Sequence, residues 1–168
     1  GVQQIVSGGQ TMNPSTEDIL HAAEQVPAMD VYVLPNNKNI VMAAEQAARL
    51  ARTSGVRRIH VVPTTTIPQG ISAMMAYDES AEIKDNVEAM QEAASRVQSG
   101  SVTFAARDSD YDGHQIKEGE LLALENGKVA FTGTDLGSVT AKVAKDLMQE
   151  DSQFITLLYG ADVSEEQA

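Results

Sequence analysis

The chain has 168 residues, of which 42% are hydrophobic and only 4% aromatic, so its core must be built from aliphatic side chains and methionine. The absence of cysteine excludes thiol catalysis and thiolate metal sites and fits the reducing cytosol, so we expect a cytoplasmic protein. A formal net charge of −12 makes nucleic acid and anionic lipid unfavourable partners, and no apolar run approaches the ~20 residues of a transmembrane helix.

The first half of the chain is expected to alternate strands and helices. Two helices are predicted, one capped by Asn13 or by Ser15 and one running over residues 40–53 and closed by Gly55. Such alternation implies an α/β fold, in which a parallel sheet carries flanking helices. Three short segments are predicted to be its strands: 2–7, 31–34 and 59–62.

The second half changes character, and we expect a boundary near Asp78. Residues 1–78 are assigned to an α/β subdomain, and residues 79–168 to an α+β subdomain packed on it. The chain starts at Gly1 without Met and directly with a predicted strand, and at its other end Ser164 and Gln167 form a capping-box pattern that predicts a further helix, so we expect both ends to be truncated. The predicted elements of the second half are a helix over 82–97, a strand over 101–106, a hairpin of strands 121–124 and 128–131 around Asn126-Gly127, a helix over 136–148 and a strand over 154–159.

Three polar loops follow the three predicted strands, at residues 9–15, 35–39 and 63–70. Ligands of open α/β sheets bind at the carboxyl edge, so the loops predict a functional edge. The alternative is that their Asn, Ser and Thr residues are ordinary caps and turns. Four methionines near the loops can line an adaptable contact surface, although core filling is the commoner use of methionine: Met12, Met42, Met74 and Met75. The candidate binding residues are Thr11, Asn13, Ser15, Asn36, Asn37, Asn39, Thr65 and Gln69.

No catalytic residue, cofactor or metal is assigned to the chain. Neither common nucleotide-binding motif is present, and Glu17 and Asp18 in the first helical turn oppose an anion there. Residues 108–113 imitate the start of an EF-hand loop, but Gly119 stands at the twelfth position, so a surface turn is expected. Three isolated histidines, without metal-ligand spacing, are expected to be structural: His21, His60 and His114.

Five stretches carry a resemblance to a known family. They are GGQTMNPSTEDIL (8–20), LPNNKNIVMAAEQAA (34–48), VVPTTTIPQGISAM (61–74), ARDSDYDGHQIKEG (106–119) and FITLLYGADVSEEQA (154–168). Together they resemble the C-terminal domain of the dihydroxyacetone-kinase-like, ATP-binding subunit of bacterial fatty acid kinase.

The resemblance implies a two-component kinase. ATP and magnesium would bind in a helical domain of the parent protein outside this chain, and a separate DegV-like carrier would present the fatty acid. The carboxylate would be phosphorylated to an acyl phosphate that feeds phospholipid synthesis. This domain would have a DegV-like fold and would engage the carrier without being catalytic, with the eight candidate residues as its partner-binding site.

Two other functions stay open. The loop at residues 11–15 is similar to the carrier's T-S-Q-P-S loop, which would suit a DegV-like module that binds a small molecule or a lipid. However, Asn36, Asn37 and Asn39 stand where the carrier has a serine-rich segment for the lipid head, so we expect acyl binding to be lost. A free-standing hydrolase or kinase is the third possibility, and the missing motifs argue against it.

Overall fold

The computed structural model describes residues 2–8, 12–111, 114–161 and 163–168. It is a mixed α/β structure that divides into two compact units, residues 1–97 (unit 1) and 98–168 (unit 2). The expected boundary between residues 78 and 79 falls inside unit 1. None of the helices in the described part of the chain combines the length and hydropathy of a membrane span.

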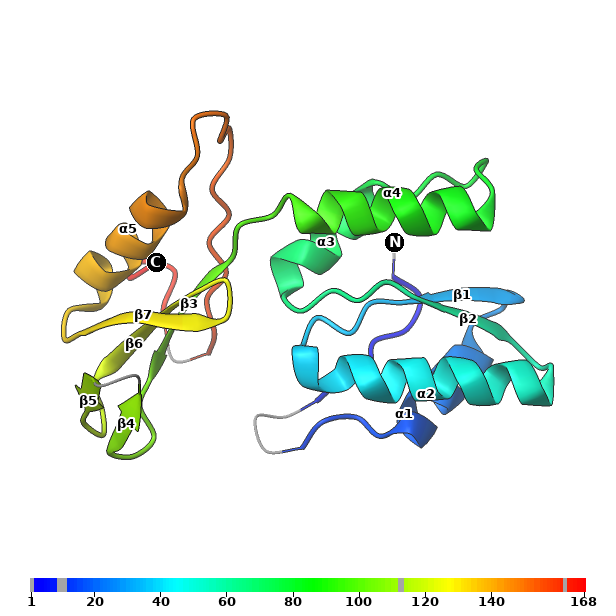
Figure 1. The fold of residues 1–168 in the computed structure, drawn as a ribbon, viewed down its shortest axis with the longest axis horizontal. Helices are drawn as coiled ribbons and strands as arrows, with labels where there is room; N and C mark the ends of the chain where they lie inside the picture. The colour runs from blue at the N-terminus through cyan, green and yellow to red at the C-terminus, as the bar shows by residue number, and fades with distance from the viewer. Residues whose placement is uncertain (1, 9–11, 112–113, 162) are drawn as a thin grey trace. The chain divides into compact units, whose positions relative to one another are not determined.

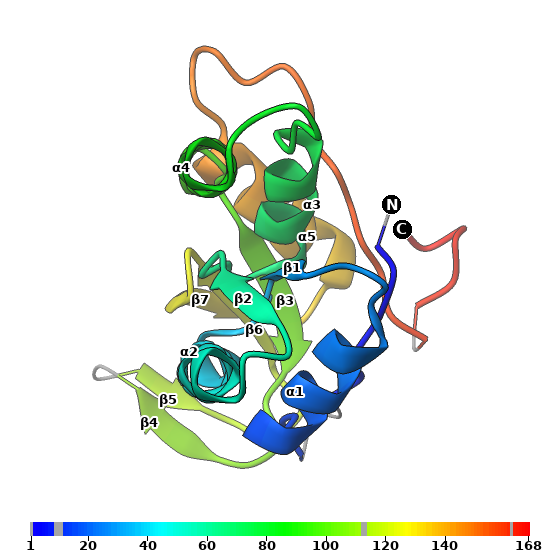
Figure 2. The same cartoon turned by 90° about the vertical axis from the view of Figure 1, so that its right-hand side faces the viewer.

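Unit 1 is built on two parallel strands, β1 (Asp30–Val33) and β2 (Arg58–Val61). Figures 1 and 2 show α1 (Thr16–Gln25) and α2 (Lys38–Ser54) on one face of this pair, and α3 (Ile67–Met75) and α4 (Ile83–Ser95) on the other. The predicted parallel strands with flanking helices are confirmed for β1 and β2. A specifically DegV-like arrangement stays a prediction.

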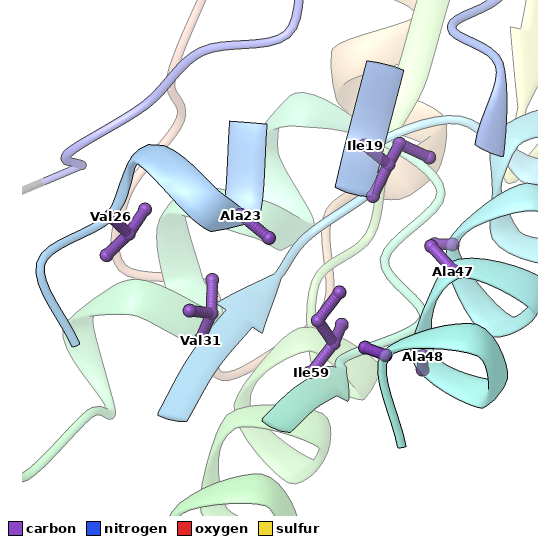
Figure 3. Close-up of a cluster of buried hydrophobic side chains, with 9 residues drawn as sticks. Ile19, Ala23, Val26, Val31, Ala47, Ala48 and Ile59 are labelled. Carbon is purple, nitrogen blue, oxygen red and sulfur yellow. The ribbon is translucent and has the colours of Figure 1, made fainter. Parts of the chain in front are cut away.

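Small side chains let α2 lie close to the sheet. Ala44, Ala47, Ala48 and Ala51 are buried and pack with Ile19 and Ala23 of α1 and with Val31 and Ile59 of the strands (Figure 3). The absence of bulk on this helix face brings the helix axis near the strands, where dispersion contacts are dense. A second cluster, Val62, Ala73, Met90 and Ala94, fills the opposite face and explains why α4 belongs to unit 1.

The helix ends follow the predicted caps. Ser15 and Asp18 form a reciprocal capping box at the start of α1, with Ser15 Oγ accepting from the Asp18 amide at 3.1 Å. Gly55 ends α2 at a φ of 69°, a conformation in the left-handed region that glycine adopts without a steric penalty.

Unit 2 contains the antiparallel sheet β3–β6–β7, made of β3 (Gly100–Phe104), β6 (Leu121–Glu125) and β7 (Lys128–Gly133), with α5 (Leu136–Leu147) on one face. Asn126 and Gly127 join β6 to β7 with φ angles of 48° and 82°, as a type I′ hairpin requires. A second hairpin is formed by β4 (Ser109–Tyr111) and β5 (His114–Ile116).

Three predictions about elements were wrong. Neither 2–7 nor 154–159 is a strand in the structure, because β-propensity alone cannot create a ladder and a strand needs a neighbouring backbone to bond. The loop predicted over 63–70 already contains the start of α3, which Thr66 caps and in which Pro68 occupies the first turn. Proline and threonine are common loop residues, but the same pair also marks a helix start.

Candidate functional site

A hollow of about 330 Å³ lies at the carboxyl end of β1, and we call it the edge hollow. Its walls come from residues 5–8, from the loop after β1 and from the first turns of α2 and α3. The lining as described contains no ionisable side chain, so the hollow suits binding by shape and amide hydrogen bonds rather than acid–base chemistry. It is lined by Ile5, Val6, Gly8, Asn13, Leu34, Pro35, Asn36, Asn37, Ile40 and Ile67.

Asn36 holds the loop after β1 to the loop after β2. Its side-chain carbonyl accepts a hydrogen bond from Thr64 Oγ1 at 2.8 Å, and its backbone amide donates to the same oxygen at 3.3 Å. Thr64 is only 1% exposed. Asn36 has a φ of 55°, a left-handed conformation that asparagine tolerates better than most residues. Asn36 therefore stabilises the loop conformation at the edge hollow, which it also lines.

The first turn of α3 packs directly on Asn36. A β-carbon built on Gly70 would lie closer than 3.0 Å to the side-chain oxygen of Asn36. Glycine is needed here because the amide of Asn36 occupies the space that any larger residue would fill. The Asn36 side chain thus connects the loops after β1 and β2 to the first turn of α3, through its hydrogen bond to Thr64 and its packing against Gly70.

Several candidate residues serve as caps. Ser15 caps α1, and the Asn37 side chain accepts from the Asn39 amide at 2.9 Å and caps α2. Gln69 Oε1 accepts from the amide of Thr65 at 2.8 Å and from its hydroxyl at 2.9 Å. These contacts agree with the alternative that polar loop residues brace turns, and they leave partner binding as a prediction.

The structure brings part of the predicted site together. Asn13, Asn36 and Asn37 line the edge hollow, whereas Ser15, Asn39, Thr65 and Gln69 lie outside its lining. Gln69 lines a different hollow of about 290 Å³ with Val62, Pro63, Gln91, Ala94 and Ser95. Thr11 lies outside the described residues.

The sequence singled out Met74 and Met75 but not the whole apolar face of α3 to which they belong. Ile67, Ile71, Met74 and Met75, which we call the α3 face, are all exposed, and Met75 is 83% exposed. Their spacing of four, seven and eight residues from Ile67 places them along one side of the helix. That spacing was visible in the sequence, but only the structure shows that Gly70 and Ala73 are the buried side.

The four methionines near the loops do not fill the core. Met12, Met42 and Met75 are 76%, 78% and 83% exposed, and Met74 is exposed as well. Their thioether side chains are flexible and polarizable and adapt to different surfaces. The contact-surface interpretation therefore fits the structure better than the core-filling one.

A charged cluster lies at the other end of the sheet. Arg58 donates two hydrogen bonds to Asp30, at 2.7 and 2.5 Å, and His60 Nε2 lies 2.8 Å from Asp30 Oδ1. The hydrogen bonds from Arg58 and then from His60 hold the pKa of Asp30 well below its ordinary value of 3.8. His60 also stacks near Tyr32, with ring centroids 5.5 Å apart. These contacts with Asp30 and Tyr32 agree with the structural role that the sequence predicts for His60.

The structure also shows where the EF-hand-like residues and His21 lie. Residues 109–111 form a strand of the β4–β5 hairpin, and Asp108 Oδ1 accepts from the Glu118 amide at 2.7 Å. His21 lies 2.8 Å from Gln25 Nε2 on α1. Within residues 2–8, 12–111, 114–161 and 163–168, no cluster of three or more His, Asp or Glu could hold a metal ion. That the chain needs no metal or cofactor stays a prediction.

Comparison with known proteins covers the whole chain. Residues 1–168 match the family of FakA-like C-terminal domains of fatty acid kinase. The chain is 41% identical to Protein YloV of Bacillus subtilis over 168 residues, which is 100% of this chain and 30% of that protein. It is 43% identical to an uncharacterized protein of Staphylococcus haemolyticus over 166 residues, which is 99% of this chain and 29% of that protein. A Staphylococcus epidermidis protein is 44% identical over 162 residues, 96% of this chain and 29% of its own length.

Proposed function

Because the chain belongs to the FakA-like C-terminal family of fatty acid kinase, we propose that it is a non-catalytic docking domain of such a kinase. Its partner in this proposal is a DegV-like carrier that presents the fatty acid in the cytosol. The chain spans 29–30% of the length of these curated relatives. Binding of ATP and magnesium and transfer of the phosphoryl group to the carboxylate are therefore assigned to other parts of the parent protein.

The observation that carries the docking role is the α3 face beside the edge hollow. Ile67 belongs to both, so an exposed apolar helix face continues into a hollow lined by amides. Contiguous exposed apolar surface marks interaction sites on soluble proteins. A mixture of apolar anchors with uncharged hydrogen-bonding groups is typical of interface centres, from which charged residues are depleted.

The acidic charge of the chain acts on the rate of association. With a net charge of −12, the chain would be attracted before contact to a carrier that offers a basic patch. Such steering raises the association rate more than the final affinity, and salt screens it. We therefore expect carrier binding to slow as salt is added, with a smaller change in the dissociation rate.

The docking role is tested with variants of the α3 face. Ile71→Ser with Met75→Ser should weaken carrier binding by tenfold or more and lower the melting temperature only slightly, since Met75 is 83% exposed and Ile71 is 38% exposed. Met148→Ser, at a methionine 56% exposed in unit 2, is the matched control. Unchanged affinity in the double variant, measured by calorimetry, would contradict docking through this face.

The polar loop residues are poor probes of docking. Truncating Asn36, Asn37 and Gln69 together would also remove the hydrogen bonds that each makes inside unit 1. We expect that triple variant to melt earlier, so a loss of binding in it would not distinguish docking from unfolding.

A second candidate is a small-molecule or lipid-binding module of the DegV-like type. The apolar part of the edge-hollow lining, which includes Leu34, Ile40 and Ile67, favours it. Mass spectrometry of the protein after gentle solvent extraction distinguishes the two. The docking proposal expects no bound fatty acid, and a stoichiometric fatty acid would favour the binding module.

A further inference from the structure

Residues 154–159 expose an apolar surface with the sequence of a strand. Phe154 is 88% exposed and Ile155 is 66% exposed, and Leu157, Leu158 and Tyr159 are each about half exposed. The segment lies outside every strand in the described part of unit 2. Nearly continuous apolar residues on both sides of a strand are typical of a strand that is covered on both faces.

Strand β3 has an open edge in the same unit. It lies at the end of the sheet order β3–β6–β7, and its far side has no strand partner among the described residues. The carbonyl of Ser99 and the amide of Ala105 are both bonded towards the β6 side. Because bonding direction alternates along an antiparallel strand, the residues between them with backbone groups facing the open edge are Gly100, Val102 and Phe104.

Helix α5 leads the chain from one edge of the sheet to the other. A β-carbon built on Gly133, the last residue of β7, would collide with Val139 early in α5. One built on Gly100, the first residue of β3, would collide with Val143 and Leu147 at the other end of the helix. The chain therefore leaves α5 above the beginning of β3. Residues 148–153 can then span up to about 20 Å, which is enough to descend to the sheet edge.

Residues 154–159 are unpaired in the structure, and we propose that they also adopt a docked state, in which they lie on the open edge of β3 as a fourth strand, parallel to β3. Strands β3 and β7 run in the same direction because both are antiparallel to β6. A connection from β7 through α5 to a new strand beside β3 is the usual way in which parallel strands are joined. In Figures 1 and 2 the orange chain after α5 first rises into a loop, and the orange and red chain that follows descends in the same direction as β3.

Docking of this segment closes an edge that would otherwise be available to another chain. An open strand edge and an exposed apolar segment are both sites of unwanted pairing. When residues 154–159 occupy the edge, their backbone groups bond to those of β3, and the neighbouring side chain of Phe104, now 59% exposed, is partly covered. The inference concerns unit 2 and does not depend on the proposed docking function.

Disulfide trapping in the 168-residue chain tests the docked state, because the chain contains no other cysteine. Thr103→Cys is combined in turn with a cysteine at each position from 154 to 159, because alternate positions face opposite sides of the sheet and neighbouring strands lie about 4.8 Å apart, within disulfide reach. One of these pairs should form a disulfide within the monomer. Thr132→Cys on β7 with Leu157→Cys is the control and should not. Absence of any monomeric disulfide with Thr103→Cys, equal trapping at Thr132→Cys, or disulfides only between chains would overturn the proposal.

Hydrogen exchange supplies a second readout. The amides of Gly100, Val102 and Phe104 should exchange slowly in the unmodified chain and at least tenfold faster in Leu157→Pro, which lacks the amide hydrogen of a docked strand. The amides of Ser101 and Thr103 bond to β6 and should stay slow in both proteins, which shows that the sheet is intact. Fast exchange at Val102 and Phe104 in the unmodified chain would contradict a docked strand.

Discussion

The hydroxyl of Thr64 donates a hydrogen bond to the side-chain carbonyl of Asn36 across 2.8 Å, and this contact joins the loops that follow β1 and β2. The two residues are 28 positions apart in the sequence. Thr64 is buried, so its hydroxyl depends on Asn36 for a partner that water cannot readily replace.

Thr64→Val should lower the free energy of unfolding by about 1–3 kcal/mol, because it keeps the shape of the side chain and removes the hydrogen bond to a half-buried amide. Urea denaturation measures the change. Thr103→Val, at an exposed position of β3, is the control and should stay within about 0.5 kcal/mol of the parent chain. In the Thr64→Val background, Asn36→Ala should cost less than it does alone, since the two side chains share one interaction.

Gly70→Ala should destabilise unit 1 although it lies in a helix. Alanine normally stabilises a helix by about 0.5–1 kcal/mol relative to glycine. Here its β-carbon would displace the Asn36 amide and break the bond to Thr64, so we expect a net loss of about 1–3 kcal/mol. Gly137→Ala in α5 meets nothing closer than 3.8 Å and should be neutral or stabilising. If both variants gained stability, the close packing of Asn36 against Gly70 would not restrict the residue at position 70, and this prediction would be wrong.

Asp30 should make stability depend on acid pH. Its pKa is held below the ordinary 3.8 in the folded chain, chiefly by the hydrogen bonds from Arg58. The unfolded chain therefore takes up the proton first as the pH falls. The stabilisation is complete above pH 3.8 and is lost as the pH drops towards the folded pKa.

The measurement compares the parent chain with Asp30→Asn by urea denaturation between pH 7 and pH 2. The parent should be the more stable protein at pH 7, and the difference should shrink below about pH 4. Asp151→Asn, at an exposed position after α5, serves as the control. A difference between parent and Asp30→Asn that is the same at pH 7 and pH 2 would show that the ion pair with Arg58 does not stabilise the fold.

Calcium should not stabilise the chain, despite the EF-hand-like residues 108–113. Asp108 is already bonded to the Glu118 amide, and residues 109–111 form a strand rather than a calcium loop. Thermal melts in millimolar calcium and in chelator should coincide. Stabilisation by more than ~2 kcal/mol, as ligand about a hundredfold above its dissociation constant gives, would reverse this expectation.

The chain should not bind ATP by itself. It has no phosphate-binding motif, and Glu17 and Asp18 place negative charge at the start of α1, where a phosphate would otherwise be attracted. Calorimetric titration with magnesium and ATP should show no binding heat. A dissociation constant in the low micromolar range would require a nucleotide site that the sequence does not reveal.

The helix caps and the hairpin turn, which depend on residues close together in the sequence, were predictable from the sequence. The Ser15–Asp18 capping box, the glycine at position 55 and the Asn126-Gly127 turn all lie where expected, because each depends on residues within a few positions of one another. The buried face of α2 also follows from a local pattern, because Ala44, Ala47, Ala48 and Ala51 recur at helical spacing. The long family motifs, rather than any site geometry, indicated the family to which the chain belongs.

Only the tertiary structure decided the features that depend on residues far apart in the sequence. Residues 2–7 and 154–159 have strand-forming sequences, yet a strand requires a neighbouring backbone, which β-propensity does not supply. Asn36 is one of several loop amides in the sequence, and only the fold places Thr64 and Gly70 beside it. The exposure of Ile71 and Met75 depends on what α3 packs against, because the sequence specifies that a side chain is apolar but packing determines whether it is covered.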